Sequence, residues 1–332
     1  AAPLPATFDT SSLNGANGFT LTSLRSKYFG LSVAGTGDVN GDGKTDLIVG
    51  APNANNYAGA AYVIFGADHF PSTFDTSSLN GANGFTLTSS GGFLGYSVAS
   101  TGDINGDGKT DLIVGSHIYS NTNKAYVIFG ADHFPSTFDT SSLNGTNGFT
   151  LTSSSPYFGA SVAGTGDVNG DGKPDLIVGA SVGSNTDKAY VIFGASHFPA
   201  TFDTSSLNGV NGFTLTSSTK GFGFSVAGTG DVNGDGKPDL IVGASTNSNS
   251  DKAYVIFGTT AFPAIFDTSR LNGANGFTLI SSSKTFGTSV AGTGDINGDG
   301  KPDLIVGADA AGKAYVIFGA ATFPATFDTS SL

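Results

Sequence analysis

The chain of 332 residues contains no cysteine, so disulfide bonds contribute nothing to its stability. It also contains no glutamate, and all 26 acidic residues are aspartates. Aspartate is a residue of turns and metal sites, whereas glutamate is the usual acid on helix surfaces. We therefore expect the acidic side chains to serve in turns and sites.

Positive charge and long apolar runs are also scarce. Only 14 residues are basic, the formal net charge is -12, and no basic cluster is present, which argues against a nucleic-acid partner. No run approaches about 18 apolar residues, so we predict no membrane insertion. The chain has no G-x-S-x-G motif, Ser/His/Asp order or phosphate loop, and we predict that it is not an enzyme.

What the chain has in abundance is a repeat. The stretch "GDVNGDGKPDLIVG" (Gly166–Gly179) occurs five times in closely similar form. Its first aspartate recurs at intervals of 65, 64, 64 and 64 residues, at Asp38, Asp103, Asp167, Asp231 and Asp295. A period of this length indicates one architecture built from small units, and we predict a single domain over residues 1–332.

Each repeat is predicted to form four short strands. In the third copy these are Ser161–Gly166, Leu176–Gly179, Ala189–Gly194 and Phe213–Ser217, which are rich in β-branched and aromatic residues and bounded by turn residues. No segment has a helical period, so the chain is predicted to be all-β. Four antiparallel strands repeated radially form the blades of a β-propeller.

The order of strands along the chain predicts how such a ring would close. An isolated fourth strand, Phe19–Ser23, precedes four full blades, and the chain ends after three strands of a fifth. We therefore predict a five-bladed β-propeller of four-stranded antiparallel blades, closed by the N-terminal strand completing the last blade. An open stack of sheets or a solenoid is the alternative.

The acidic loop resembles a calcium-binding loop in its spacing. In the third copy, side-chain oxygens at positions 1, 3, 5 and 9 come from Asp167, Asn169, Asp171 and Asp175, and the carbonyl of Lys173 stands at position 7. Oxygen donors alternating around a glycine wrap Ca²⁺, which takes 6–8 oxygen ligands. A metal-free hairpin turn is the alternative, but it does not need three mutually repelling carboxylates.

The same donor positions recur in every copy, which predicts five structural Ca²⁺ ions. Mg²⁺ fits less well, because it prefers to retain several waters. The ligand sets of the other four loops are Asp38, Asn40, Asp42, Lys44 and Asp46; Asp103, Asn105, Asp107, Lys109 and Asp111; Asp231, Asn233, Asp235, Lys237 and Asp239; and Asp295, Asn297, Asp299, Lys301 and Asp303.

The repeat "YFGASVAGTGDVNGDGKPDLIVGAS" (Tyr157–Ser181) resembles the FG-GAP repeats of the integrin α-subunit propeller and its bacterial relatives. The FG pair is present in four copies, and Leu94–Gly95 replaces it in the second. The resemblance implies Ca²⁺ bound between the first two strands of each blade. It also implies an extracellular location and a role in adhesion or ligand binding. Integrin propellers have seven blades, whereas this chain has five repeats.

Loops on the face opposite the acidic loops differ among the copies. Neutral drift of exposed loops is one interpretation. The other is a recognition face for an extracellular protein or glycan, because tyrosine and arginine dominate binding hot spots. The candidate residues on this face are Arg25, Lys27, Tyr28, Tyr57, His117, Tyr119 and Tyr157.

The two ends of the chain nearly duplicate each other. Ala320–Leu332 differs from Ala1–Leu13 at only two of thirteen places. A domain boundary or a dangling terminus is one explanation. The other is that identical subunits join head to tail through this segment into a filament.

The sequence therefore predicts an extracellular, calcium-binding adhesion or ligand-binding module, with a structural subunit of an extracellular assembly as the alternative.

Overall fold

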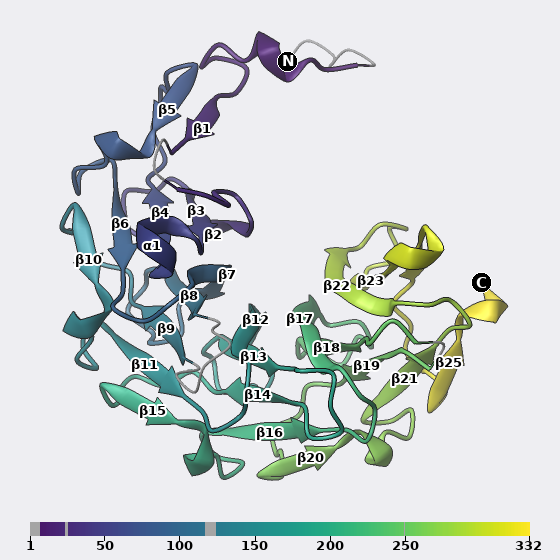
Figure 1. Cartoon of the computed structure of the whole chain (residues 1–332). Coiled ribbons are helices and arrows are strands. Elements are labelled where there is room, and N and C mark those ends of the chain that lie inside the picture. The colour runs from purple at the N-terminus through teal and green to yellow at the C-terminus, as the bar shows by residue number, and fades with distance from the viewer. Residues whose placement is uncertain (1–6, 24–25, 117–123, 249) are drawn as a thin grey trace.

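The computed structural model describes residues 7–23, 26–116, 124–248 and 250–332. These residues form β-sheets that follow one another along an arc, with the two ends of the chain apart (Figure 1). The chain is all-β, as predicted, and its sheets are propeller blades. No helix among the described residues is long and apolar enough to cross a membrane.

Four sheets are complete, and each holds five strands. The first contains β2 (Val33–Gly37), β3 (Asp46–Ala51), β4 (Ala60–Ile64), β6 (Gly84–Thr88) and β10 (Thr137–Asp139). The second contains β7 (Leu94–Gly102), β8 (Asp111–Ser116), β9 (Lys124–Ile128), β11 (Gly148–Thr152) and β15 (Thr201–Asp203). The third contains β12 (Phe158–Gly166), β13 (Asp175–Ala180), β14 (Lys188–Ile192), β16 (Gly212–Thr216) and β20 (Ile265–Asp267). The fourth contains β17 (Phe222–Gly230), β18 (Asp239–Ala244), β19 (Lys252–Ile256), β21 (Gly276–Ile280) and β25 (Thr326–Asp328).

The fifth strand of each complete sheet comes from the next repeat. In the third sheet, β20 pairs in parallel with β16, in the register Thr214↔Ile265. The four-stranded antiparallel blade predicted from the sequence is therefore present, with an added parallel strand that covers its outer edge. An uncovered edge would expose unpaired backbone groups, so this strand also protects the sheet.

Short helical turns follow these outer strands. The turn after β20 begins where the Asp267 carboxylate accepts a hydrogen bond from the backbone N–H of Ser269, at 2.9 Å. That hydrogen bond caps the turn, and hydrogen bonding from the Ser269 side chain and backbone lowers the pKa of Asp267. The helical segments are η1 (Thr10–Ser12), α1 (Ala54–Tyr57), η2 (Thr76–Ser78), η3 (Thr140–Ser142), η4 (Thr204–Ser206), η5 (Thr268–Arg270), η6 (Asp309–Ala311) and η7 (Thr329–Ser331).

The two remaining sheets are incomplete, and they stand at the two ends of the arc. One contains β22 (Phe286–Gly294), β23 (Asp303–Ala308) and β24 (Lys313–Ile317). The other contains β1 (Thr20–Thr22) and β5 (Thr73–Asp75). Together they hold the same set of strands as one complete sheet, three inner and two outer.

The structure does not confirm that the N-terminal strand completes the last blade. Among the described residues, β1 pairs with β5, in the register Thr20↔Thr73, and not with β24. This matches the pairing of every other fourth strand with the outer strand of the next repeat, and it fixes β1 beside the first blade. Five blades in a closed ring therefore stay a prediction.

The hydrophobic core lies between neighbouring blades. In one cluster, Ile177 and Phe213 of the third blade pack with Leu240 and Ile256 of the fourth, all at 0% exposure. Phe213 also stacks on Phe262, with ring centroids 4.1 Å apart. Because both faces of each blade are buried, the strands are almost continuously apolar and do not alternate.

The glycines of the repeat allow this close approach. Gly223 has a positive φ of 84°, and the φ angles of its equivalents in the other repeats lie between 84° and 87°. Its carbonyl oxygen faces Gly179 of the preceding blade. A Cβ at Gly179 would lie 2.1 Å from that oxygen, which no side chain permits. The glycines of the "FG" and "GA" pairs are thus required where blade meets blade.

At the ends of the arc the same residues have no neighbour to cover them. Phe318 is 53% exposed, whereas its repeat equivalent Phe257 is 5% exposed. At the other end, Val33 is 65% exposed, whereas its equivalents Val98, Val162 and Val226 are buried. Each end of the arc presents half of a blade-to-blade core.

This difference predicts unequal effects for one substitution at two equivalent positions. Phe257→Ala should lower the free energy of unfolding by about 3–5 kcal/mol, because it leaves a cavity between packed rings. Phe318→Ala should change it by less than about 0.5 kcal/mol, as an exposed side chain does. Urea denaturation of both variants measures this, and a large loss for Phe318→Ala would show that its face is covered in solution.

Candidate functional site

The strand register places two kinds of loop at opposite ends of each blade. In the third blade, Gly166 pairs with Asp175 at one end, and Phe158 pairs with Ala180 at the other. The acidic loop lies at the first end. The loop between the second and third strands and the connection entering the blade lie at the second. One face of the molecule therefore carries the repeated acidic loops, and the opposite face carries the loops whose sequences vary between blades.

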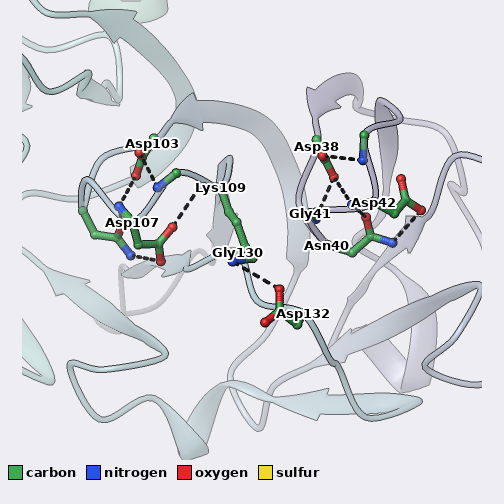
Figure 2. Close-up of polar contacts among 12 residues, drawn as sticks. Asp38, Asn40, Gly41, Asp42, Asp103, Asp107, Lys109, Gly130 and Asp132 are labelled. Carbon is green, nitrogen blue, oxygen red and sulfur yellow. Dashed lines mark hydrogen bonds and ion pairs between the residues drawn. The ribbon is translucent and has the colours of Figure 1, made fainter.

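Each acidic loop folds around its first aspartate (Figure 2). The Asp38 carboxylate accepts backbone hydrogen bonds from Gly41, Asp42 and Gly43, at 2.7, 3.0 and 2.8 Å. The Asn40 amide donates to the Asp42 carboxylate at 3.0 Å. The other four loops repeat these contacts. The loop thus gathers the oxygens at positions 1, 3 and 5 along one turn.

The aspartate at position 9 is buried, and it ties the loop to the third strand. Asp175 accepts hydrogen bonds from the backbone N–H groups of Val168 and Gly194, at 2.9 and 2.8 Å. Burial, helped by the nearby carboxylates of Asp171 and Asp167, raises the pKa of Asp175 to about 7. A buried carboxylate with acidic neighbours favours a compensating positive charge.

The same environment surrounds the position-9 aspartates of other repeats. Burial raises the pKa of Asp111 and of Asp239 to about 7 as well, and it raises the pKa of Asp46. In each case the carboxylates at positions 5 and 1 add to the effect. A raised pKa at position 9 is therefore common to the loops of four repeats.

The predicted ligand sets suit a hard cation in their chemistry, because they offer oxygen atoms alone. Each oxygen of Asp175 accepts one N–H group and keeps a lone pair for a further partner. Among the described residues, however, no group of three or more His, Cys, Asp or Glu side chains converges as a metal site. The calcium ligands therefore remain predictions.

The candidate residues of the variable face fall into three groups. Arg25, His117 and Tyr119 lie outside the described residues. Lys27, Tyr28 and Tyr57 are exposed on the first blade. Tyr157 lines a hollow of about 660 Å³ farther along the arc.

This hollow is formed by the second, third and fourth blades. Its lining residues are Tyr96, Tyr157, Ala160, Ser181, Val182, Gly183, Phe224, Ser245 and Thr246. Sequence reasoning found only Tyr157. Tyr96, Ala160 and Phe224 occupy the same position in three successive repeats, so comparing copies at that position would have revealed two aromatic residues around a small one.

Aromatic residues also occupy a strained backbone position just before the first strand. Tyr28, Phe93 and Tyr157 have φ angles of 60°, 59° and 58°, in the left-handed region. The fourth repeat places Gly221 there, as backbone sterics favour. Each aromatic residue costs about 1–2 kcal/mol in this conformation. Strain of this kind occurs often at binding sites.

Two buried aspartates order the loops that wall the hollow. The Asp187 carboxylate accepts backbone hydrogen bonds from Val182 and Ser184, and a third from Gly221 of the next blade at 3.0 Å. Asp251 accepts equivalent bonds from Thr246 and Ser248 in the fourth blade. The walls are therefore held in place before any ligand arrives.

Comparison with known proteins identifies the repeat. The FG-GAP repeat family matches residues 29–64, 94–128, 158–192, 222–256 and 286–317, together more than half of the chain. Integrin alpha-5 of Xenopus laevis is 31% identical over 236 residues, which cover 67% of this chain and 20% of that protein. Integrin alpha-IIb of Mus musculus is 33% identical over 241 residues, covering 68% and 21%.

The chain thus spans about a fifth of the length of these integrin subunits. Among solved structures, a fungal lectin from Aleuria aurantia, with a six-bladed β-propeller fold and a novel fucose recognition mode, aligns with a TM-score of 0.43. It is 14% identical, and the alignment covers 90% of this chain and 80% of the lectin. A likeness this low carries no inference about ligands.

Proposed function

The chain belongs to the FG-GAP repeat family, and from this premise we propose that it is an extracellular, calcium-binding module that recognises a protein or glycan ligand. The observation that carries the proposal is the division between its two faces. One face presents five nearly identical acidic loops, and the other presents loops that differ in every blade. Repetition suits a structural task, and variation suits recognition.

Calcium is proposed to act structurally. In each loop the side chains at positions 1, 3, 5 and 9, together with the position-7 carbonyl, would hold the ion. When bound, the ion supplies positive charge to clustered carboxylates, and five ions would add +10 to a net charge of -12. The protein's own contribution is the turn of backbone N–H groups that orients Asp38 and its equivalents.

Ligand recognition is proposed for the variable face, with no catalysis. The exposed Tyr28 and Tyr57 and the half-buried Tyr157 supply the aromatic area on which binding hot spots depend.

The incomplete sheets favour a second candidate function, in a structural assembly. The three strands ending at β24 lack the outer pair that β1 and β5 supply at the other end. Within one chain, joining them would give the closed five-bladed ring. Between chains, it would join identical subunits head to tail. The C-terminal duplicate does not make this joint, because β25 already pairs with β21 of its own chain.

The calcium proposal predicts how many ions the chain and its variants bind. The wild-type chain should bind five Ca²⁺ by native mass spectrometry, with dissociation constants of roughly 10⁻⁴–10⁻³ M. At ten times the dissociation constant, each site should add about 1.4 kcal/mol to the free energy of unfolding. The double variant Asp167→Asn, Asp171→Asn should bind four. Asp132→Asn, an exposed aspartate paired with Lys109, is the matched control and should still bind five. A wild-type chain without bound Ca²⁺ would refute the proposal.

Ligand recognition predicts binding that depends on the variable face. The whole chain, with Ca²⁺, should bind at least one member of a panel of immobilised matrix proteins and neutral glycans. Tyr57→Ala should weaken binding to a protein ligand, whereas Val210→Ala, at an 84% exposed residue on the opposite face, should not. Equal losses for both variants, or no binding to the panel, would contradict the proposal.

The assembly candidate predicts a mass that depends on the exposed core face. Light scattering of the wild-type chain should show multimers that grow with concentration. Val316→Lys, which places charge on the face that the joint would bury, should return the mass to that of a monomer. A wild-type monomer at every concentration would exclude assembly and leave ring closure within the chain.

A further inference from the structure

Three successive blades contribute one residue each to the mouth of the hollow described above. Tyr96, Ala160 and Phe224 follow the "LG" or "FG" pair at the start of β7, β12 and β17. The three side chains are large, small and large in that order. The small side chain of Ala160 therefore leaves space between the rings of Tyr96 and Phe224. Phe224 is 51% and Tyr96 37% exposed, which is unusual for side chains of this size.

The chemistry of the lining is neutral throughout. It combines aromatic rings with the hydroxyl groups of Ser181, Ser245 and Thr246, and it includes no charged side chain. The Ser181 and Ser245 hydroxyls donate to Asp187 and Asp251, so their oxygens remain available as acceptors. Within this lining, a phosphate or carboxylate ligand would find no cation to pair with.

We propose that this hollow binds a neutral sugar ring, held against Tyr96 and Phe224 and hydrogen-bonded by the serine and threonine oxygens. A sugar presents apolar C–H groups on its faces and hydroxyl groups around its rim, which matches aromatic rings beside polar walls. The inference rests on the proposed function, since it names the ligand class of the variable face.

The size and rigidity of the site agree with this occupant. A volume of about 660 Å³ lies within the range of small-molecule sites, roughly 300–1,000 Å³. A second hollow of about 560 Å³ shares Thr246 and continues between the third and fourth blades, past Lys220 and Asp251. A ligand of more than one sugar residue therefore fits better than a monosaccharide. The walls held by Asp187 and Asp251 reduce the ordering that binding requires.

The test is titration of the whole chain, with Ca²⁺, by saturation-transfer NMR and calorimetry. The probes are methyl glycosides of neutral hexoses, deoxyhexoses and N-acetylhexosamines, and their disaccharides. At least one disaccharide should bind. Phe224→Ala and Tyr96→Ala should each weaken its binding at least tenfold, and Ala160→Phe should abolish it by filling the space. Leu31→Ala is the matched control, because Leu31 follows the FG pair of the first repeat as Phe224 follows that of the fourth, and it does not line the hollow.

Two results would overturn the inference. One is the absence of binding to every probe. The other is binding that Phe224→Ala and Tyr96→Ala leave unchanged; both side chains are exposed, so these variants keep the fold even where Ala160→Phe does not. Binding to a matrix protein alone would refute the sugar site while the proposed function survived. Failure of the whole protein and glycan panel would refute both.

Discussion

Burial of one blade by the next is the constraint on which the rest of this structure depends. No single sheet here encloses a core, because residues such as Ile177 and Leu240 meet only across the boundary between repeats. Glycine is required where the boundary is closest, at Gly179 and Gly223. Each repeat therefore supplies both a sheet and the two surfaces that pack against its neighbours. Because every such interface is alike, the copies have nearly the same sequence.

The same constraint makes the ends of the arc chemically distinct from its middle. Phe318 and Val33 belong to sequences that elsewhere are buried, and here they face solvent. Stacked repeats usually protect such ends with capping units of different composition. This chain has none among its described residues, since its first and last units keep the repeat sequence. Each exposed end therefore presents residues that, in the middle of the arc, belong to a blade-to-blade core.

Much of this architecture could be predicted from periodicity. Strand positions, the FG-GAP relationship and the placement of the acidic loops follow from residues that are close together in the sequence. The outer strand Ile265–Asp267 did not, because three residues beside a proline resemble a loop and their partner, Thr214–Thr216, belongs to the previous repeat. The hollow was missed for a similar reason: Tyr96, Ala160 and Phe224 become neighbours only when three blades pack. Ring closure depends on the angle between blades. That angle is set by side-chain volumes at each interface, and a count of repeats does not reveal it.

The aspartates show how one residue type is divided among three tasks by its surroundings. At caps such as Asp267, hydrogen bonding from the Ser269 side chain and backbone lowers the pKa and stabilises the charge. At Asp175, burial opposes the charge and raises the pKa, so the loop gains from a cation. At Asp187, several donors satisfy a buried carboxylate within the protein, and the loop is already rigid. The acidic loops thus hold a buried carboxylate beside acidic neighbours, whereas the loops around the hollow already satisfy their buried carboxylates within the protein. The loops around the hollow can therefore differ between blades without loss of the repeated frame.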